Sequence, residues 1–321
     1  MKNTKNIIEY KFELKKFDLT FAGKVSNIKV KYSIYGKLSL PIVVVLGGIS
    51  ANHKVMGHEG WWGNIVGEYK SIDIRKFCVI SIDYYSGVSS PRLNNTLISS
   101  YDQANLVKKL LDYLNINLIH AFIGSSYGGM VALAFGELYS NFTKRLICIC
   151  AAHKNSIKSI ALREVQRNIV KLTSLSKEGV ALARSLAMIG YRGEEEFEER
   201  FSTEPKIHNG RTHFEVSHYL NHNGRKFANN FDTNKYLNLS NSIDIHRINP
   251  KKIKSNTLLI AMNSDQLVPI KLMKELQKSI SAPCHFQEIP SKFGHDGFLL
   301  EHEKIGNLIQ QFLRKEKNND S

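Results

Sequence analysis

The sequence predicts an α/β fold in which a mostly parallel central sheet is flanked by helices. Short β-branched runs alternate along the chain with segments whose apolar residues recur at helical spacing. Most of these runs are apolar throughout, as expected of strands that are covered on both faces. We expect strands at residues 41–46, 77–83, 118–124, 145–151, 257–262 and 284–289.

The other elements of the predicted core follow in order from the N-terminus. Residues 25–34 alternate between apolar and polar side chains, which indicates a strand with one exposed face. Between the later strands, apolar residues recur at helical spacing at 101–115, 131–140 and 271–280. These three helices would cover the parallel sheet, and right-handed crossovers leave few possible topologies.

The pattern changes between residues 153 and 250. Strand-like runs stop there, and helical patterns follow one another at 160–172, 179–191, 194–201 and 216–231. We therefore expect a helical insertion in an α/β core. The predicted division is a core at residues 1–152 and 251–315, a helical lid subdomain at 153–250, and a frayed tail at 316–321.

Composition argues against several classes of protein. The chain has no run of about 18 apolar residues, so no membrane span is expected, and its charged N-terminus lacks the apolar core of an export signal. The net charge is +15, but Lys and Arg are spread along the whole chain, so nucleic-acid binding is not expected. Four cysteines imply no disulfide framework. We expect Cys148 and Cys150 to be buried free thiols on one face of a strand. We also expect the protein to be cytoplasmic.

The stretch GSSYG, residues 124–128, matches the pattern G-x-S-x-G with Ser126 at its centre. A strand-like run precedes it and a helix-like run follows it. On such a sharp turn a serine oxygen is exposed, provided that its neighbours are small. The context predicts a nucleophile at Ser126, whereas the alternative is a tight turn with a serine helix cap. Ser125 lacks the central position.

A serine nucleophile needs a base, and the expected chain order for this type of sheet is serine, acid, histidine. Asp265 follows the strand at 257–262, where ligand-facing residues collect. His295 lies in the loop after the strand at 284–289. Separately, these residues could be a helix cap and a surface histidine. Together they predict a triad in which Asp265 orients His295.

An acyl-transfer site also needs backbone donors for the oxyanion. One candidate is the amide of Tyr127, the residue directly after the nucleophile. The second donor is expected in the turn after the strand at 41–46, from Gly48 or Ile49. Both donors would then lie at the ends of neighbouring strands.

Longer blocks occur in a fixed order along the chain: LGGISANHKV, EGWWGNIVG, FCVISIDYYSG, GSSYGGMVALAF, REVQRNIV, MIGYRGEEEFEERF, YLNHNGRKFANNFDTNKYLNLSNSID, NSDQLVP and FGHDGFLLE. From about residue 25 to residue 303, the sequence thereby resembles the homoserine O-acyltransferases of the α/β-hydrolase superfamily, which perform the first acyl transfer of methionine biosynthesis. The resemblance implies an α/β-hydrolase fold and a triad of Ser126, Asp265 and His295. It also favours Ile49 as the second oxyanion donor.

The resemblance further implies how the amino-acid substrate is bound. Arg192, in GYRGEEEF, matches the arginine that clamps the substrate carboxylate, and Asp296 matches the aspartate that meets its ammonium group. The chemistry agrees, because a zwitterion needs one cation and one anion, and the arginine fork is bidentate. The alternatives are a surface salt bridge from Arg192 to the adjacent glutamates and a turn residue at Asp296. The family also implies a homodimer.

Two positions depart from the acetyl-transferring branch of this family. That branch commonly has methionine at the position of Tyr127 and asparagine at the position of Arg163. The blocks GISAN, YDQAN and SYGGMVALAF are more similar to the gammaproteobacterial branch that transfers succinyl. A succinyl group carries an extra carboxylate, so we hypothesise that Arg163 contacts it. The alternative for Arg163 is a solvated helix face.

The expected reaction is a double displacement that uses no cofactor. Ser126 attacks the thioester of an acyl-CoA, preferably succinyl-CoA, and the hydroxyl of L-homoserine then takes the acyl group. The alternatives are acetyl-CoA as donor, L-serine as acceptor, a serine esterase and a non-catalytic binding protein. No metal is expected, because His218 and His222 are four residues apart without the glutamate of an H-E-x-x-H motif.

Overall fold

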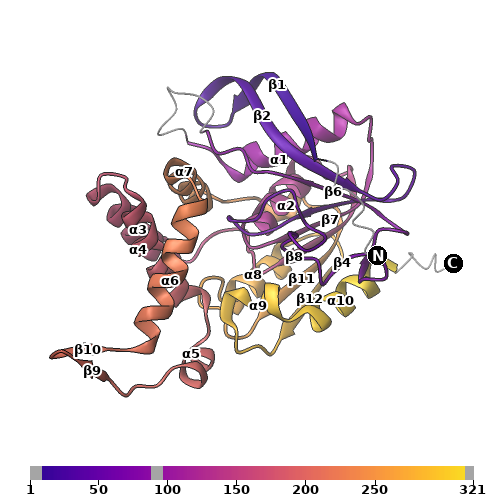
Figure 1. Cartoon of the computed structure of the whole chain (residues 1–321). Coiled ribbons are helices and arrows are strands. Elements are labelled where there is room, and N and C mark those ends of the chain that lie inside the picture. Colours follow the sequence, from indigo (N-terminus) through magenta and orange to yellow (C-terminus); the bar gives the residue numbers. More distant parts are fainter. Residues whose placement is uncertain (1–8, 88–96, 315–321) are drawn as a thin grey trace, which may run out of the picture.

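An eight-stranded sheet forms the centre of the protein in a computed structural model that describes residues 9–87 and 97–314 (Figure 1). Its strand order is β1-β2-β6-β3-β7-β8-β11-β12. β1, β2 and β6 pair antiparallel, and the strands from β6 to β12 pair parallel. The strands are β1 (Glu9–Leu19), β2 (Gly23–Tyr35), β3 (Ile42–Leu46), β6 (Cys78–Ile82), β7 (Ile119–Ser125), β8 (Thr143–Ile149), β11 (Asn256–Met262) and β12 (Cys284–Ile289), with β4 (Val66–Gly67) and β5 (Ile72–Asp73) as a separate pair.

The burial of the strands follows the sequence pattern that predicted them. β3 is buried along its whole length, with Val44 packed in one apolar cluster and Val43 and Val45 in another. β2 instead alternates buried and exposed side chains along most of its length, as expected of a strand with one exposed face. Together with the parallel pairing from β6 to β12, this burial confirms the predicted mostly parallel sheet.

Helices cover both faces of this sheet. α1, α2 and α8 pack on one face, and α10 covers the other together with the segment around Trp62. α1 begins at a capping box in which the side chains of Ser99 and Asp102 bond to each other's backbone amides. The core helices are α1 (Ser100–Tyr113), α2 (Tyr127–Leu138), α8 (Ile270–Ser279), α9 (Gly297–Leu300) and α10 (His302–Arg314), with 3₁₀ turns at Pro250–Lys252 and Gly294–Asp296.

Between β8 and β11 the chain forms a group of helices, called the insertion below, that lies to one side of the sheet (Figure 1). α4 packs against both α3 and α6. The helices predicted in this region are present. The insertion consists of α3 (Ile157–Leu172), α4 (Lys177–Tyr191), α5 (Glu194–Arg200), α6 (Glu215–Asn230), α7 (Thr233–Asp244) and a hairpin of β9 (Lys206–His208) and β10 (Arg211–His213).

The structure corrects the sequence-based expectation for two of the cysteines. All four cysteines are free, and Cys148 and Cys150 are buried as predicted, but the two side chains pack in apolar clusters on opposite faces of the sheet. The reason is local, since β8 ends at Ile149 and Cys150 has a φ of +50°, which breaks the alternation. Among the described residues, no helix is long and apolar enough to cross a membrane. The predicted tail at 316–321 lies outside the described residues.

Candidate active site

Ser126 stands on a sharp turn between β7 and α2. Its φ of 53° and ψ of −121° are strained for a residue with a side chain. The Ser126 amide donates to the carbonyl of Ile149 at 2.8 Å, which holds the turn against β8. Glycine is required beside it, because a Cβ atom on Gly124 would lie 2.1 Å from the carbonyl oxygen of Gly128. The small neighbours predicted from the motif thus have a steric cause.

A continuous chain of hydrogen bonds joins Ser126, His295 and Asp265. The Ser126 Oγ lies 2.7 Å from His295 Nε2, and His295 Nδ1 lies 2.7 Å from Asp265 Oδ2. The second carboxylate oxygen of Asp265 accepts the amides of Leu267 and Val268 at 2.8 and 2.9 Å. These two amides hold the Asp265 carboxylate in place, and the carboxylate orients the imidazole of His295 toward Ser126.

The environment of His295 favours its protonated form. Burial by itself would lower the pKa of His295, but the charge of Asp265 and its hydrogen bond outweigh burial and raise this pKa. An imidazolium that forms when His295 takes the serine proton would be stabilised in the same way. The serine, the histidine and the buried acid can therefore activate a nucleophile.

Cys150 lies beside this pair. Its Sγ, a carboxylate oxygen of Asp265 and a ring nitrogen of His295 all lie within 4.8 Å of one another. Burial raises the pKa of the Cys150 thiol well above its usual range. A metal ion bound here would have to displace that proton, because the thiolate and not the thiol is the metal ligand.

The two residues predicted to supply the oxyanion donors lie in chain segments that border the serine. A Cβ atom on Gly48 would be 4.0 Å from Ser126 Oγ, so the turn after β3 passes directly against the nucleophile. Ile49 and Tyr127 both line the cavity that contains Ser126. The Tyr127 amide belongs to the first turn of α2, where amides lack an acceptor within the helix.

The cavity above Ser126 is narrow, at about 40 Å³. Its floor comes from the core, and the rest of its wall comes largely from α3, α4 and α7 of the insertion. One part of the wall is apolar, and another carries polar side chains. The apolar part includes Met130, Leu186, Ala187, Ile243, Leu267 and Val268, and the polar part includes Asn155, Ser159, Arg163 and Gln166.

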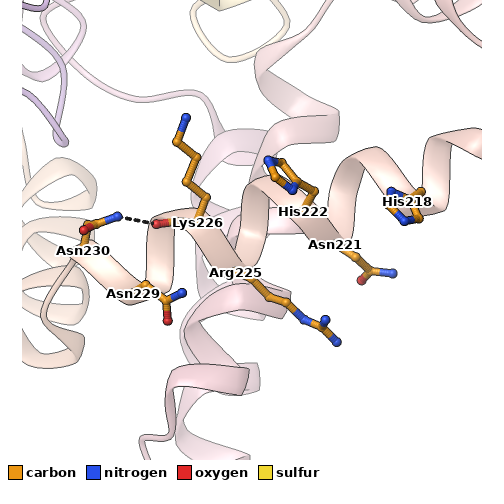
Figure 2. Close-up of a pocket in the computed structure, with 7 residues that line it drawn as sticks. All are labelled: His218, Asn221, His222, Arg225, Lys226, Asn229 and Asn230. Carbon is orange, nitrogen blue, oxygen red and sulfur yellow. Dashed lines mark hydrogen bonds between the residues drawn. The ribbon is translucent and has the colours of Figure 1, made fainter.

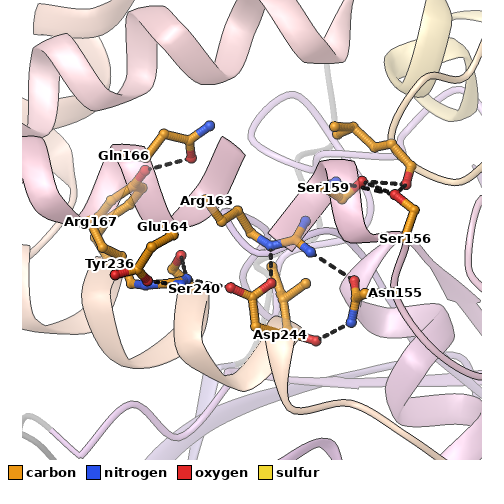
Figure 3. A network of polar contacts seen from close by, with 12 residues as sticks. Asn155, Ser156, Ser159, Arg163, Glu164, Gln166, Arg167, Tyr236, Ser240 and Asp244 are labelled. Atoms are coloured by element: carbon orange, nitrogen blue, oxygen red, sulfur yellow. Dashed lines mark hydrogen bonds and ion pairs between the residues drawn. The ribbon is translucent and has the colours of Figure 1, made fainter. Parts of the chain in front are cut away.

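Arg163 belongs to this wall and is held by a polar network (Figure 3). Its Nε lies 2.5 Å from Asp244 Oδ1, and its Nη2 donates to Asn155 Oδ1 at 2.8 Å. The other oxygen of Asp244 accepts from Arg167 at 2.6 Å. The side chain of Arg163 is only 12% exposed. The interpretation of Arg163 as part of a solvated helix face is therefore wrong.

Arg192 and Asp296 lie beside the triad and pair with each other. Arg192 Nε is 3.3 Å from Asp296 Oδ2, an ion pair without hydrogen-bond alignment, and its Nη1 donates to both oxygens of Glu196 at 3.0 and 3.2 Å. Arg192 thus makes a salt bridge to an adjacent glutamate, as the alternative interpretation expected, although Glu196 is buried and the bridge is not a surface one. The contact of Arg192 with a substrate carboxylate stays a prediction. Among the described residues, Arg192 lines a neighbouring hollow with Tyr219 rather than the cavity above Ser126.

Burial acts on both members of this ion pair. It raises the pKa of Asp296 above the usual value, and Arg192 only partly offsets that effect. Burial also opposes the charged form of Arg192, but Asp296, Tyr219 and Glu196 outweigh it and raise the pKa of the guanidinium. A guanidinium and a carboxyl group are therefore held largely out of water, and the carboxyl group belongs to the residue directly after His295.

Sequence reasoning missed two aromatic side chains that enclose His295. The Tyr191 ring is stacked on the imidazole with centroids 6.0 Å apart, and the Phe298 ring meets it edge-on at 5.8 Å. Trp62 Nε1 donates to the carbonyl of Phe298 at 3.1 Å and fixes it. The only sequence signal for Tyr191 is its position directly before Arg192, a predicted site residue.

His218 and His222 lie far along the insertion, on α6, where they line a surface hollow of about 500 Å³ (Figure 2). Arg225 and Lys226 line the same hollow. Arg225 and Lys226 lie within about a turn of His222, and two cationic side chains there disfavour a metal cation.

Known proteins are similar to this chain along most of its length. The family model described as the alpha/beta hydrolase fold matches residues 41–302. A homoserine O-succinyltransferase from Xanthomonas campestris pv. campestris is 33% identical to the chain, over 90% of this chain and 79% of its own length. The chain belongs to the homoserine O-acyltransferase family of α/β hydrolases.

Solved structures agree with this assignment at the level of the fold. A homoserine O-acetyltransferase from Staphylococcus aureus is 25% identical, with a TM-score of 0.85 over 98% of this chain and 97% of that one. Esterase E22 is 21% identical, with a TM-score of 0.88 over 96% of this chain and all of that one. The same architecture therefore also occurs in an esterase. The fold alone does not show whether water or an amino acid accepts the acyl group.

Proposed function

We propose that this chain transfers an acyl group from an acyl-CoA, preferably succinyl-CoA, to the side-chain hydroxyl of L-homoserine, the first acyl transfer of methionine biosynthesis. The observation that carries this proposal is the hydrogen-bonded chain of Ser126, His295 and Asp265 beneath a narrow cavity, in a member of the homoserine O-acyltransferase family. A serine activated in this way forms a covalent acyl-enzyme.

In the first half-reaction, Ser126 Oγ attacks the thioester carbonyl while His295 Nε2 takes the serine proton. The amides of Tyr127 and Ile49 stabilise the negative oxygen of the tetrahedral intermediate. The C–S bond then breaks, and His295 returns the proton to the departing CoA thiolate. Serine, histidine and backbone amides complete this chemistry, so we propose that no cofactor is needed besides the acyl-CoA substrate.

In the second half-reaction, the homoserine hydroxyl attacks the acyl-enzyme and His295 takes its proton. The ester bond to Ser126 breaks, and the proton returns to the Ser126 oxygen. Water competes for the same intermediate. We propose that the insertion, residues 153–250, is a lid that keeps the site narrow and so favours the bound amino acid over water. The core would then comprise residues 1–152 and 251–315.

Arg192 and Asp296 are the proposed partners of the homoserine zwitterion. They pair with each other, and the substrate would contact Arg192 through its carboxylate and Asp296 through its ammonium group. Arg192→Lys keeps the charge but loses the bidentate fork. We expect it to raise the KM for homoserine about tenfold or more without changing hydrolysis of a p-nitrophenyl ester; an unchanged KM would refute this role.

Arg163 is the proposed contact for the distal carboxylate of the succinyl group. It lies in the cavity wall with Ser126, and its guanidinium is held by Asp244 and Asn155. Arg163→Asn should lower kcat/KM for succinyl-CoA about tenfold or more and leave that for acetyl-CoA nearly unchanged, because only succinyl carries the second charge. A preference that stays the same in the variant would remove Arg163 from this role.

We propose that the protein is a homodimer built through the insertion. Leu182 and Ile189 lie seven residues apart on α4, Leu175 lies in the turn just before the helix, and each of the three is at least 46% exposed. Such an exposed apolar stripe along and beside a helix is typical of a helix–helix interface. The four free cysteines agree with the cytoplasmic location that we propose.

The decisive contrast is between a transferase and an esterase. Release of CoA from succinyl-CoA can be followed with a thiol reagent, with and without L-homoserine. We expect homoserine to accelerate CoA release more than tenfold, because it consumes an acyl-enzyme that water attacks slowly. Equal rates with and without homoserine would indicate a hydrolase. L-serine in place of homoserine tests the other acceptor.

A further inference from the structure

Two buried tyrosines connect the proposed oxyanion site to the rest of the protein. The Tyr84 hydroxyl donates to the carbonyl of Gly47 at 2.5 Å, and the same carbonyl accepts the amide of Gly128 at 2.9 Å. Gly47 opens the turn that carries Ile49, and Gly128 lies in the first turn of α2. The Gly47 carbonyl therefore ties together the two chain segments that supply the proposed oxyanion donors.

The second tyrosine is Tyr127 itself. Its hydroxyl shares a hydrogen bond of 2.5 Å with the Ser242 hydroxyl, which lies in the last turn of α7. Its ring meets the Tyr84 ring edge-on, with centroids 4.8 Å apart. Tyr127, Tyr84 and Ser242 are all at most 5% exposed. Burial also raises the pKa of both phenols, so both hydroxyls keep their protons.

These contacts form one path from the oxyanion site to the insertion. α7 contributes Ser242, and the two residues after Ser242 lie at the cavity above Ser126. Ile243 lines this cavity, and Asp244 holds Arg163 in its wall. We infer that Tyr84 and Ser242 are positioning residues of the oxyanion site, and that Ser242 couples α7 of the insertion to the Tyr127 amide. The inference rests on the proposed function only in taking Ser126 as the nucleophile.

The position of an oxyanion donor decides how much it accelerates the reaction. An oxyanion donor acts only when its hydrogen-bond geometry fits the transition state, and removing such a donor lowers rates by roughly 10²–10³. Tyr84 and Ser242 touch no reacting atom, so loss of either hydroxyl should displace a donor rather than remove it. We therefore expect about a tenfold loss in the rate of attack by Ser126.

The variants Tyr84→Phe and Ser242→Ala each remove one hydroxyl and leave the proposed machinery intact. Tyr139→Phe is the matched control, since the Tyr139 hydroxyl also has a side-chain partner, Asn105 at 2.6 Å, but lies at the far end of α2. The readout is the rate at which a fluorophosphonate phosphonylates Ser126 with loss of fluoride, followed by intact-mass spectrometry. This reaction needs the serine, its base and the oxyanion site, but no acyl acceptor.

We expect Tyr84→Phe and Ser242→Ala to be labelled about tenfold more slowly than wild type, and Tyr139→Phe to be labelled at the wild-type rate. If one variant fails to fold, the other carries the test. Wild-type labelling rates in the folded variants, whatever their melting temperatures, would overturn the inference. A labelled wild type that transfers no acyl group to homoserine would refute the proposed function alone.

Discussion

At the scale of single residues, activity depends on the protonation of His295. The imidazole must be neutral to accept a proton from Ser126, and Asp265 raises the pKa of His295 above its usual value. The rate should therefore fall as the pH drops through a value above about 6.5, the pKa of a free histidine. A pH profile of kcat/KM for acyl-CoA measures this acidic limb directly.

Asp265→Asn tests the same coupling. Without the carboxylate charge the pKa of His295 should decrease, so the acidic limb should move to lower pH. The loss of orientation should also lower kcat by about 10⁴. Asp112→Asn is a suitable control, because Asp112 pairs with Lys108 on the exposed side of α1. If the limb stayed in place in Asp265→Asn, another group would be responsible for it.

The sequence predicted the catalytic residues because each of them follows a predicted strand. Ser126 lies between glycines at a strand end, and Asp265 and His295 follow later strands, so topology alone brings them together. Sequence reasoning could not find Tyr84 or Ser242, because a buried hydroxyl has no local signature. The partners Tyr127 and Ser242 are 115 residues apart in the chain, and only the packing of the insertion on the core joins them.

At the scale of elements, the turn between β7 and α2 depends on Gly124. A Cβ atom there would lie 2.1 Å from a backbone oxygen that cannot move without shifting α2. Gly124→Ala should destabilise the protein by about 3 kcal/mol or more, measured by urea unfolding. Gly136→Ala is the control, since its new methyl within the helix would come nearest to the end of the Leu146 side chain, at 3.1 Å, and would meet Ile253 at 3.6 and 3.7 Å. Equal stability of the two variants would contradict this account of the turn.

The β9–β10 hairpin shows where element prediction failed. Its strands are three residues long and exposed on both faces, so they lack the apolar alternation that reveals a strand. The turn residues Asn209 and Gly210 do carry the signal of a tight hairpin, and both have positive φ in the structure. The long buried strands were predicted correctly because burial on two faces leaves a clear mark on the sequence.

At the scale of the whole molecule, the proposed homodimer predicts the effect of a charge on α4. Leu182 is 55% exposed and lies in the stripe of the insertion. Leu182→Asp would bury an unpaired charge in the interface, so it should convert the dimer to a monomer in sedimentation experiments. Leu118→Asp is the control, because Leu118 is 45% exposed but lies outside the insertion, just before β7. A wild type that sediments as a monomer would refute the proposal.

In the proposed reaction, the acyl group passes from CoA to Ser126 and then to an amino acid. The most direct test is mass spectrometry of enzyme and products after incubation with succinyl-CoA or acetyl-CoA, each with homoserine, with serine or with no acceptor. We predict a succinyl adduct on Ser126 without acceptor, its loss when homoserine is added, and O-succinylhomoserine as the main product. Free succinate as the main product in the presence of homoserine, or no adduct on Ser126, would contradict the account.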